Sequence, residues 1–143
     1  MQVTAIAERV EHEVASPVGD GMLLLPTLWL GSSHHHIDFP GTIHIEPEVF
    51  IAFCLNITKS VAYHGFEKIL IVNGHGSNHS ICDLAARQCV LTTGIICAAT
   101  TVNAAVDPSL VRDVLDAERR GGPGSVGHAC EYETSTMLVL DPQ

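Results

Sequence analysis

The sequence has few basic residues: seven Lys and Arg stand against 16 Asp and Glu, and the formal net charge is −9. No basic stripe can neutralise phosphate groups, so nucleic acids and anionic membrane surfaces are not expected as partners. The chain lacks an apolar run near the roughly 20 residues that cross a bilayer, and its N-terminus lacks the layout of a signal peptide. We therefore expect a cytoplasmic protein with no nucleic-acid partner and no membrane partner.

Patterned cysteines are also absent. The five cysteines are odd in number, lie mostly among apolar neighbours and show no C-x-x-C spacing: Cys54, Cys82, Cys89, Cys97 and Cys130. A disulfide framework would need an even, regularly spaced set. The distribution instead predicts buried, reduced thiols at all five positions.

The sequence does contain an alternation of apolar strands and amphipathic helices. Its 143 residues suffice for one buried core and are too few for two domains of ordinary size. Apolar periodicity and Gly or Pro boundaries predict helices over 3–14, 47–64, 78–91 and 108–119, and strands over 22–25, 68–72 and 95–101. Such alternation predicts an α/β fold in which helices cover both faces of a parallel sheet, with Lys68–Val72 as its central strand.

Chemistry-bearing residues follow the predicted strand 68–72 directly. The segment Asn73-Gly74-His75-Gly76-Ser77-Asn78 leaves the carboxyl end of that strand, where ligands bind in open parallel sheets. Its two glycines would let the backbone turn sharply beside a ligand or metal, and Asn78 could cap the next helix. The same residues equally suit a tight strand-to-helix turn, because one histidine is not a metal site. The residues alone leave both interpretations open.

A second candidate follows the Gly-rich residues 121–127, which predict either an active-site loop or a surface turn. His128, Glu131 and Glu133 join an imidazole to two carboxylates, a set that suits general acid/base work or metal ligation. His128 and Glu133 converge only if His128 precedes the helix, since Glu131 would otherwise lie nearly over His128 at i+3. The alternative, which these residues alone favour, is a solvated helix start whose carboxylates meet the positive end of the helix dipole.

A third candidate, residues 31–42, contains three consecutive histidines, His34, His35 and His36. The run is internal to the sequence, which argues against an expression tag. Neighbouring side chains of a regular strand point to opposite faces, so at most one or two of these histidines should line a site. Four further histidines have no partner pattern and are predicted to be ordinary surface or satisfied histidines: His12, His44, His64 and His79.

Taken in order, three motifs resemble the creatininase family. They are P-x-x-x-x-G-x-S-x-H-H-x-x-F-P-G-T from Pro26 to Thr42, V-N-G-H-G-x-N from Val72 to Asn78, and H-A-x-x-x-E-T-S from His128 to Ser135. The resemblance covers nearly the whole chain and implies a single creatininase-like domain over residues 1–143, with a three-layer α/β/α fold and a mostly parallel sheet. It further implies a metal-dependent amidohydrolase that cleaves an amide or cyclic-amide C–N bond of a small molecule. Family members use a pair of divalent ions, commonly zinc, manganese or iron, and often form hexamers, so a homo-oligomer is expected.

The resemblance assigns roles residue by residue. His75 matches the metal-binding histidine, His128 matches the histidine that assists proton transfer, and Glu133 matches the carboxylate of the E-T-S element. Substrate-binding roles are expected for Ser33, His35, Asn73, Gly76 and Ser77. Creatininase itself has a metal-binding glutamate where this chain has Ser77, which argues against creatinine as the substrate. The implied mechanism is attack of a metal-activated hydroxide on a carbonyl, while a His or Glu passes a proton to the leaving nitrogen.

The resemblance also shows what is missing. Family members carry an upstream E-x-H-G-x-H-L-P segment and an aspartate that supply most metal ligands, whereas this chain begins inside the matching helix and stops at Gln143. We therefore expect a domain truncated at both ends that binds metal weakly, because His75 is the one ligand that its motif supports. The alternative function is a non-catalytic remnant that keeps the fold and oligomeric contacts. A sugar- or nucleotide-binding module is less favoured because no G-x-G-x-x-G motif is present.

Overall fold

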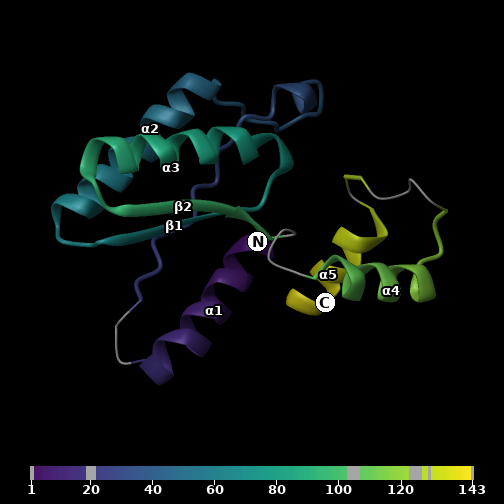
Figure 1. Ribbon diagram of the computed structural model, residues 1–143. Coiled ribbons are helices and arrows are strands. Elements are labelled where there is room, and N and C mark those ends of the chain that lie inside the picture. The colour runs from purple at the N-terminus through teal and green to yellow at the C-terminus, as the bar shows by residue number, and fades with distance from the viewer. Residues whose placement is uncertain (1, 19–21, 103–106, 123–126, 129, 143) are drawn as a thin grey trace. The chain divides into compact units, whose positions relative to one another are not determined.

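The computed structural model describes most of the chain, namely residues 2–18, 22–102, 107–122, 127–128 and 130–142. These residues belong to two compact units, one formed by residues 25–102 and the other by residues 1–24 and 103–143. The first unit contains the sheet, and the elements of the second are helices (Figure 1).

The unit of residues 25–102 is built around a strand, helix, strand sequence. Its elements are the 3-10 helix η1 (His34–His36), α2 (Pro47–Tyr63), β1 (Lys68–Asn73), the 3-10 helix η2 (Gly76–Asn78), α3 (His79–Thr93) and β2 (Ile96–Thr101). β1 and β2 pair in parallel, in register from Lys68 opposite Ile96 to Asn73 opposite Thr101. α3 forms the crossover that parallel neighbours require. The predicted helices over 47–64 and 78–91 and the parallel strands over 68–72 and 95–101 are thus confirmed.

The core of this unit lies between the helices and one face of the sheet. Figure 1 shows α2 and α3 on the same side of the β1–β2 pair. The core is formed by buried residues of both helices and by partly buried residues of both strands: Phe50, Cys54, Ile81, Cys82, Ala85, Ile71 and Ala99. Helices on a parallel sheet make this an α/β unit, as the sequence predicts.

The opposite face of the strand pair carries exposed apolar side chains. Leu70 of β1 is 61% exposed and Ile96 of β2 is 65% exposed. Among the residues that the structure describes, β1 pairs with β2 alone. The expected central position of β1, covered on both faces, is therefore wrong for this part of the chain.

The predicted strand over residues 22–25 is also wrong. Residues 22–30 have no regular structure, and the side chains of Met22, Leu23, Leu24 and Leu25 are exposed. A strand needs a neighbour to satisfy its backbone N–H and C=O groups. No described strand pairs with this run, so its apolar character alone does not produce a ladder.

The other unit consists of α1 (Gln2–Val18), α4 (Pro108–Glu118) and α5 (Glu131–Leu140). α1 and α5 contact each other within it. The helices predicted over 3–14 and 108–119 are confirmed, while residues 123–126 of the Gly-rich segment lie outside the described part. None of the described helices is both long and apolar enough to cross a membrane.

Candidate functional site

His75 lies directly after β1, at its carboxyl end, as the sequence predicts. The buried Asn73 holds the main chain of His75 on both sides. Its Nδ2 donates a hydrogen bond to the His75 carbonyl at 2.9 Å, and its Oδ1 accepts one from the His75 N–H at 3.0 Å. This clamp determines the direction in which the chain leaves the strand and so where the imidazole lies.

Residues 31–33 dock onto the turn that leads into α3. The Ser32 N–H donates to Asn78 Oδ1 at 2.9 Å, and Ser77 Oγ donates to the Ser32 carbonyl at 2.6 Å. Gly31 permits this approach, because a Cβ at that position would lie 2.6 Å from Asn78 Nδ2. Two segments far apart in sequence are thereby joined by hydrogen bonds.

Asn78 does not cap α3, although the sequence predicts that it could. It occupies the N-cap position without a side-chain capping hydrogen bond. Its Oδ1 instead accepts from Ser32, so the amide ties the docked loop to the helix start. Neither of the glycines beside His75, Gly74 and Gly76, has a positive φ.

The Phe39-Pro40-Gly41-Thr42 motif forms a tight turn behind the histidine run. The Thr42 N–H donates to the Phe39 carbonyl at 3.1 Å, and Gly41 has a φ of 86°. A proline followed by a positive-φ glycine is typical of a type II turn. Thr42 Oγ1 also donates to the His36 carbonyl at 2.9 Å, so the turn fixes the end of η1.

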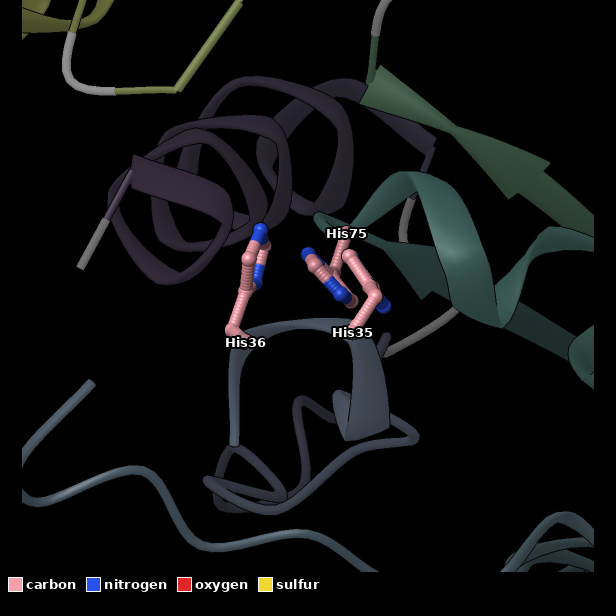
Figure 2. Close-up of side chains that lie close together, drawn as sticks. All are labelled: His35, His36 and His75. Atoms are coloured by element: carbon pink, nitrogen blue, oxygen red, sulfur yellow. The ribbon is translucent and has the colours of Figure 1, made fainter. Parts of the chain in front are cut away.

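Three imidazoles gather where η1 meets the end of β1. Candidate ligand atoms of His35, His36 and His75 all lie within 4.8 Å of one another. Figure 2 shows the three side chains converging, two from η1 and one from the end of β1. The rings of His35 and His75 are nearly parallel, with 9° between their planes and 5.7 Å between their centroids. The backbone is a 3-10 helix, not a strand, so the alternation of faces does not keep His35 and His36 apart.

His34 has a different neighbour. Its ring meets that of His44 edge to face, at a centroid distance of 5.3 Å. His44 Nδ1 accepts a hydrogen bond from the Ser33 N–H at 3.0 Å, and its Nε2 lies 3.5 Å from Glu46 Oε1. His44 Nε2 is nevertheless buried without a hydrogen-bond partner among the described residues, so the prediction of an ordinary surface or satisfied histidine is wrong for His44. The side chain of Ser33 contacts a different histidine from its backbone N–H: its Oγ lies 3.4 Å from His75 Nε2.

The helical unit carries the second candidate. α5 begins at Glu131, so His128 precedes it, which is the condition under which His128 and Glu133 can converge. The Glu131 carboxylate accepts hydrogen bonds from the backbone N–H of Arg120 and of Gly121, which gives this residue a structural contact. Convergence of His128 and Glu133 with Ser33, His35 and His75 would join the two units and stays a prediction.

The thiols fall into two groups. Cys54, Cys82 and Cys89 are buried as predicted, but Cys97 and Cys130 are partly exposed, so the expectation of burial is wrong for these two. Burial raises the pKa of Cys82 to about 11 and that of Cys97 to about 12. The pKa of Cys130 is lowered, first by the backbone N–H of Glu133 and then by that of Gly127.

Sequence reasoning assigned no role to His36 and did not connect Ser32 with Asn78. The available signal was the Pro40-Gly41 pair, which predicts a tight turn after the histidines and hence a compact loop in place of a strand. No comparable pattern marks the contact between Ser32 and Asn78, because it depends on where residues 46 positions apart meet.

The fold is a parallel α/β unit whose polar side chains gather at the carboxyl end of a strand, the place where ligands bind in open parallel sheets. The chain belongs to the creatininase family, since the family's sequence model, described as creatinine amidohydrolase, matches residues 1–143. The three motifs, the fold and the family match therefore agree.

The chain is similar to curated proteins that are named for three different activities. It is 28% identical over 144 residues to the 3-dehydro-scyllo-inosose hydrolase of Thermotoga maritima. The matched region covers 99% of this chain and 43% of that protein. It is 29% identical over 146 residues to the mycofactocin precursor peptide peptidase of Mycobacterium ulcerans, covering 97% and 47%. Identity to the creatinine amidohydrolase of Pseudomonas putida is 25% over 152 residues, covering 97% and 55%.

A solved structure supports the same fold. A single-residue mutant of type II creatininase superposes with a TM-score of 0.71 at 24% identity, covering 98% of this chain and 56% of that one. The chain thus spans about half the length of the relatives that it matches. At this identity the structural match is evidence for the fold alone.

Proposed function

We propose that the chain is part of a metal-dependent hydrolase that cleaves an amide or cyclic-amide C–N bond of a small molecule. The observation that carries the proposal is His75, held at the carboxyl end of β1 by both polar groups of the Asn73 amide. Ligand sites of open parallel sheets form at this place. The printed names of the relatives, a hydrolase, a peptidase and an amidohydrolase, support hydrolysis as the reaction type.

The residues present suit a divalent metal. His75 lies in a group of three histidine side chains whose candidate ligand atoms are within 4.8 Å of one another. Imidazole nitrogen is a common ligand of zinc and iron in proteins. When bound, the ion would polarise the carbonyl group of the substrate. The main chain of His75 is fixed by Asn73, so the imidazole extends from a defined backbone position.

Proton transfer is assigned to His128 and Glu133. The leaving nitrogen must gain a proton when the C–N bond breaks, and an imidazole or a carboxylic acid can supply it. His128 stands just before α5 and Glu133 in its first turn, so both lie at one end of the helix. Glu131 is a poorer candidate, because its carboxylate accepts hydrogen bonds from two backbone N–H groups.

The substrate pocket is assigned to the loop around the histidines. Ser33, His35, Gly76 and Ser77 surround the strand end, and Asn73 acts there by positioning His75. Ser77 carries a hydroxyl at the position where creatininase has a metal-binding glutamate, which supports a substrate other than creatinine; the hydroxyl donates to the Ser32 carbonyl. A homo-oligomer of six subunits is the assembly that the family resemblance favours.

The test is an assay of hydrolysis with the natural protein, purified from the organism that produces it. Small amides, cyclic amides, formylated amines and short peptides are offered with zinc or manganese, and release of amine or acid is measured. We expect hydrolysis of at least one class, reduced by at least about 100-fold in His75→Ala because a metal ligand is lost. His64→Ala, an exposed histidine at the end of α2, is the matched control and should retain activity.

The alternative predicts a different outcome. A non-catalytic remnant would keep the fold and the subunit contacts, yet hydrolyse none of the offered substrates with either metal. Equal activity in wild type and His75→Ala would also contradict the proposal, because the reaction would then not depend on the strand-end histidine.

A further inference from the structure

His44 is an almost buried histidine that has no role in the proposed function. Its side chain is 10% exposed. The main chain of His44 pairs with Gly31 in an isolated parallel bridge, and the Ile45 N–H donates to the Gly31 carbonyl at 3.1 Å. His44 is therefore tied through its backbone to the loop that contains Ser33 and the histidine run.

The two ring nitrogens of His44 have different surroundings. Nδ1 accepts a hydrogen bond from the Ser33 N–H at 3.0 Å, so this nitrogen carries no proton. The proton of a neutral ring is then on Nε2, which is buried without a hydrogen-bond partner among the described residues. Glu46 Oε1 lies 3.5 Å from Nε2, and the Glu46 side chain makes no capping hydrogen bond to α2. A carboxylate beside one ring nitrogen helps to keep the other nitrogen available as an acceptor.

Ser33 connects His44 with the histidine at the end of β1. Its backbone N–H donates to His44, while its Oγ lies 3.4 Å from His75 Nε2. The hydrogen bond to His44 fixes the orientation of the peptide group of Ser33. It thereby limits the positions that the Ser33 hydroxyl can take relative to the His75 imidazole.

We propose that His44 is a positioning residue, which holds Ser33 against the His75 imidazole while Glu46 accepts a hydrogen bond from its Nε2. The role differs from that of Asn73, which fixes the main chain of His75, because His44 acts on the surroundings of the imidazole. A histidine that only fills space would need neither a defined tautomer nor a connection to His75. The inference rests on the proposed function for the place of Ser33 and His75 in the active site, but its hydrogen bonds can be measured without a reaction.

The first test determines the tautomer of His44. Nitrogen–proton correlation spectra of the histidine rings distinguish a neutral ring protonated on Nε2 from one protonated on Nδ1. We expect the Nε2–H form for His44, with resonances that shift in Glu46→Ala. Glu48→Ala is the matched control, because Glu48 lies in the first turn of α2, and it should leave the His44 resonances unchanged. A ring protonated on Nδ1, or equal shifts in both variants, would overturn the inference.

The second test follows the effect from His44 to His75. His44→Phe keeps a buried ring but removes the acceptor, so it should shift the ring resonances of His75. His44→Asn places an amide oxygen near the position of Nδ1 and should restore them in large part. His64→Phe, at an exposed position, is the control for the loss of a histidine and should leave His75 unchanged.

The hydroxyl of Ser33 provides the decisive comparison. In a Ser33→Ala background the contact with His75 is already lost, so His44→Phe should cause no further shift of the His75 resonances. Circular dichroism checks the fold of every variant. Unchanged His75 resonances in His44→Phe, no recovery in His44→Asn, or a full shift in the Ser33→Ala background would each overturn the inference. The expected shifts in a protein that hydrolyses no substrate would overturn the proposed function and leave the positioning role standing.

Discussion

Asn73 shows how one side chain can determine the geometry of a site. Its amide is buried at the last residue of β1 and both donates to and accepts from the main chain of His75. A buried amide group of this kind stabilises the fold and orients the next residue at the same time. Such double hydrogen bonding is not visible in sequence, where Asn73 reads as a substrate-binding residue.

We predict that Asn73→Ala lowers the free energy of unfolding by about 2 kcal/mol, because two hydrogen bonds of about 1 kcal/mol each are lost. Urea denaturation followed by circular dichroism measures the change. Asn56→Ala, at an exposed position of α2, is the control and should change stability little. A loss in Asn73→Ala no larger than in Asn56→Ala would show that the clamp contributes nothing.

The thiols allow a second prediction at this scale. Because the pKa of Cys130 is lowered by the N–H groups that face it, more of its thiolate is present near neutral pH than for an ordinary cysteine. Burial raises the pKa of Cys82 to about 11 and of Cys97 to about 12, so these two stay protonated there. At pH 7, iodoacetamide should therefore modify Cys130 first, and raising the pH should accelerate Cys97 far more than Cys130.

Peptide mass mapping after short exposure to iodoacetamide measures this order. Cys130→Ser is the control, because it should abolish the most rapid modification and so assign that reaction to Cys130. Modification of Cys97 before Cys130 at pH 7 would contradict the prediction.

At the scale of elements, the end of α3 depends on one glycine. Gly94 is the C-cap of α3 with a φ of 76°, and its N–H donates to the Val90 carbonyl at 2.9 Å. The sequence predicts this stop correctly, because glycine after a helical pattern is the usual C-cap residue. The turn then delivers the chain into β2 in register with β1.

We predict that Gly94→Ala lowers stability by about 1–2 kcal/mol, the usual cost of placing a side chain in left-handed backbone. Gly122→Ala is the matched control, since Gly122 has no positive φ and open space around its missing Cβ. Thermal unfolding of the two variants beside wild type measures the difference. Equal midpoints for both variants would mean that the backbone of residue 94 relaxes without cost.

Helices and parallel strands could be predicted because their signals are local. Pro47 at the first turn of α2, Gly94 after α3 and the apolar run of β1 each act within a few residues. The apolar run Met22–Leu25 was wrongly predicted to be a strand, because strand formation depends on a neighbouring strand elsewhere in the chain. Convergence of His36 on His75 could not be predicted for the same reason, since it depends on how far apart two loops lie.

At the scale of the whole molecule, exposed apolar surface sets the behaviour in solution. The face of the β1–β2 pair away from α2 and α3 carries Leu70 and Ile96, each more than half exposed. Apolar side chains on an open sheet face favour association with another surface. The net charge of −9 opposes this, but charges spread over a chain do not cover one sheet face.

We predict that wild-type chain self-associates with rising concentration and that Leu70→Lys shifts the population toward smaller species. Sedimentation velocity between low and high micromolar concentration measures the distribution. Ala52→Lys, at an exposed position of α2, adds the same charge elsewhere and should leave association unchanged. An equal effect of both substitutions would assign association to net charge and not to the sheet face.

The hydrogen bond between Ser32 and Asn78 joins residues 46 positions apart, so it affects the order of folding as well as the site. α2 and α3 can form from local contacts, whereas this connection must wait until the intervening chain has closed a long loop, which costs entropy. We therefore expect the histidines to meet late in folding. A metal ion that binds these histidines binds only molecules in which they have already met. At a free-ion concentration 100 times the dissociation constant, the ion stabilises the folded state by about 2.7 kcal/mol.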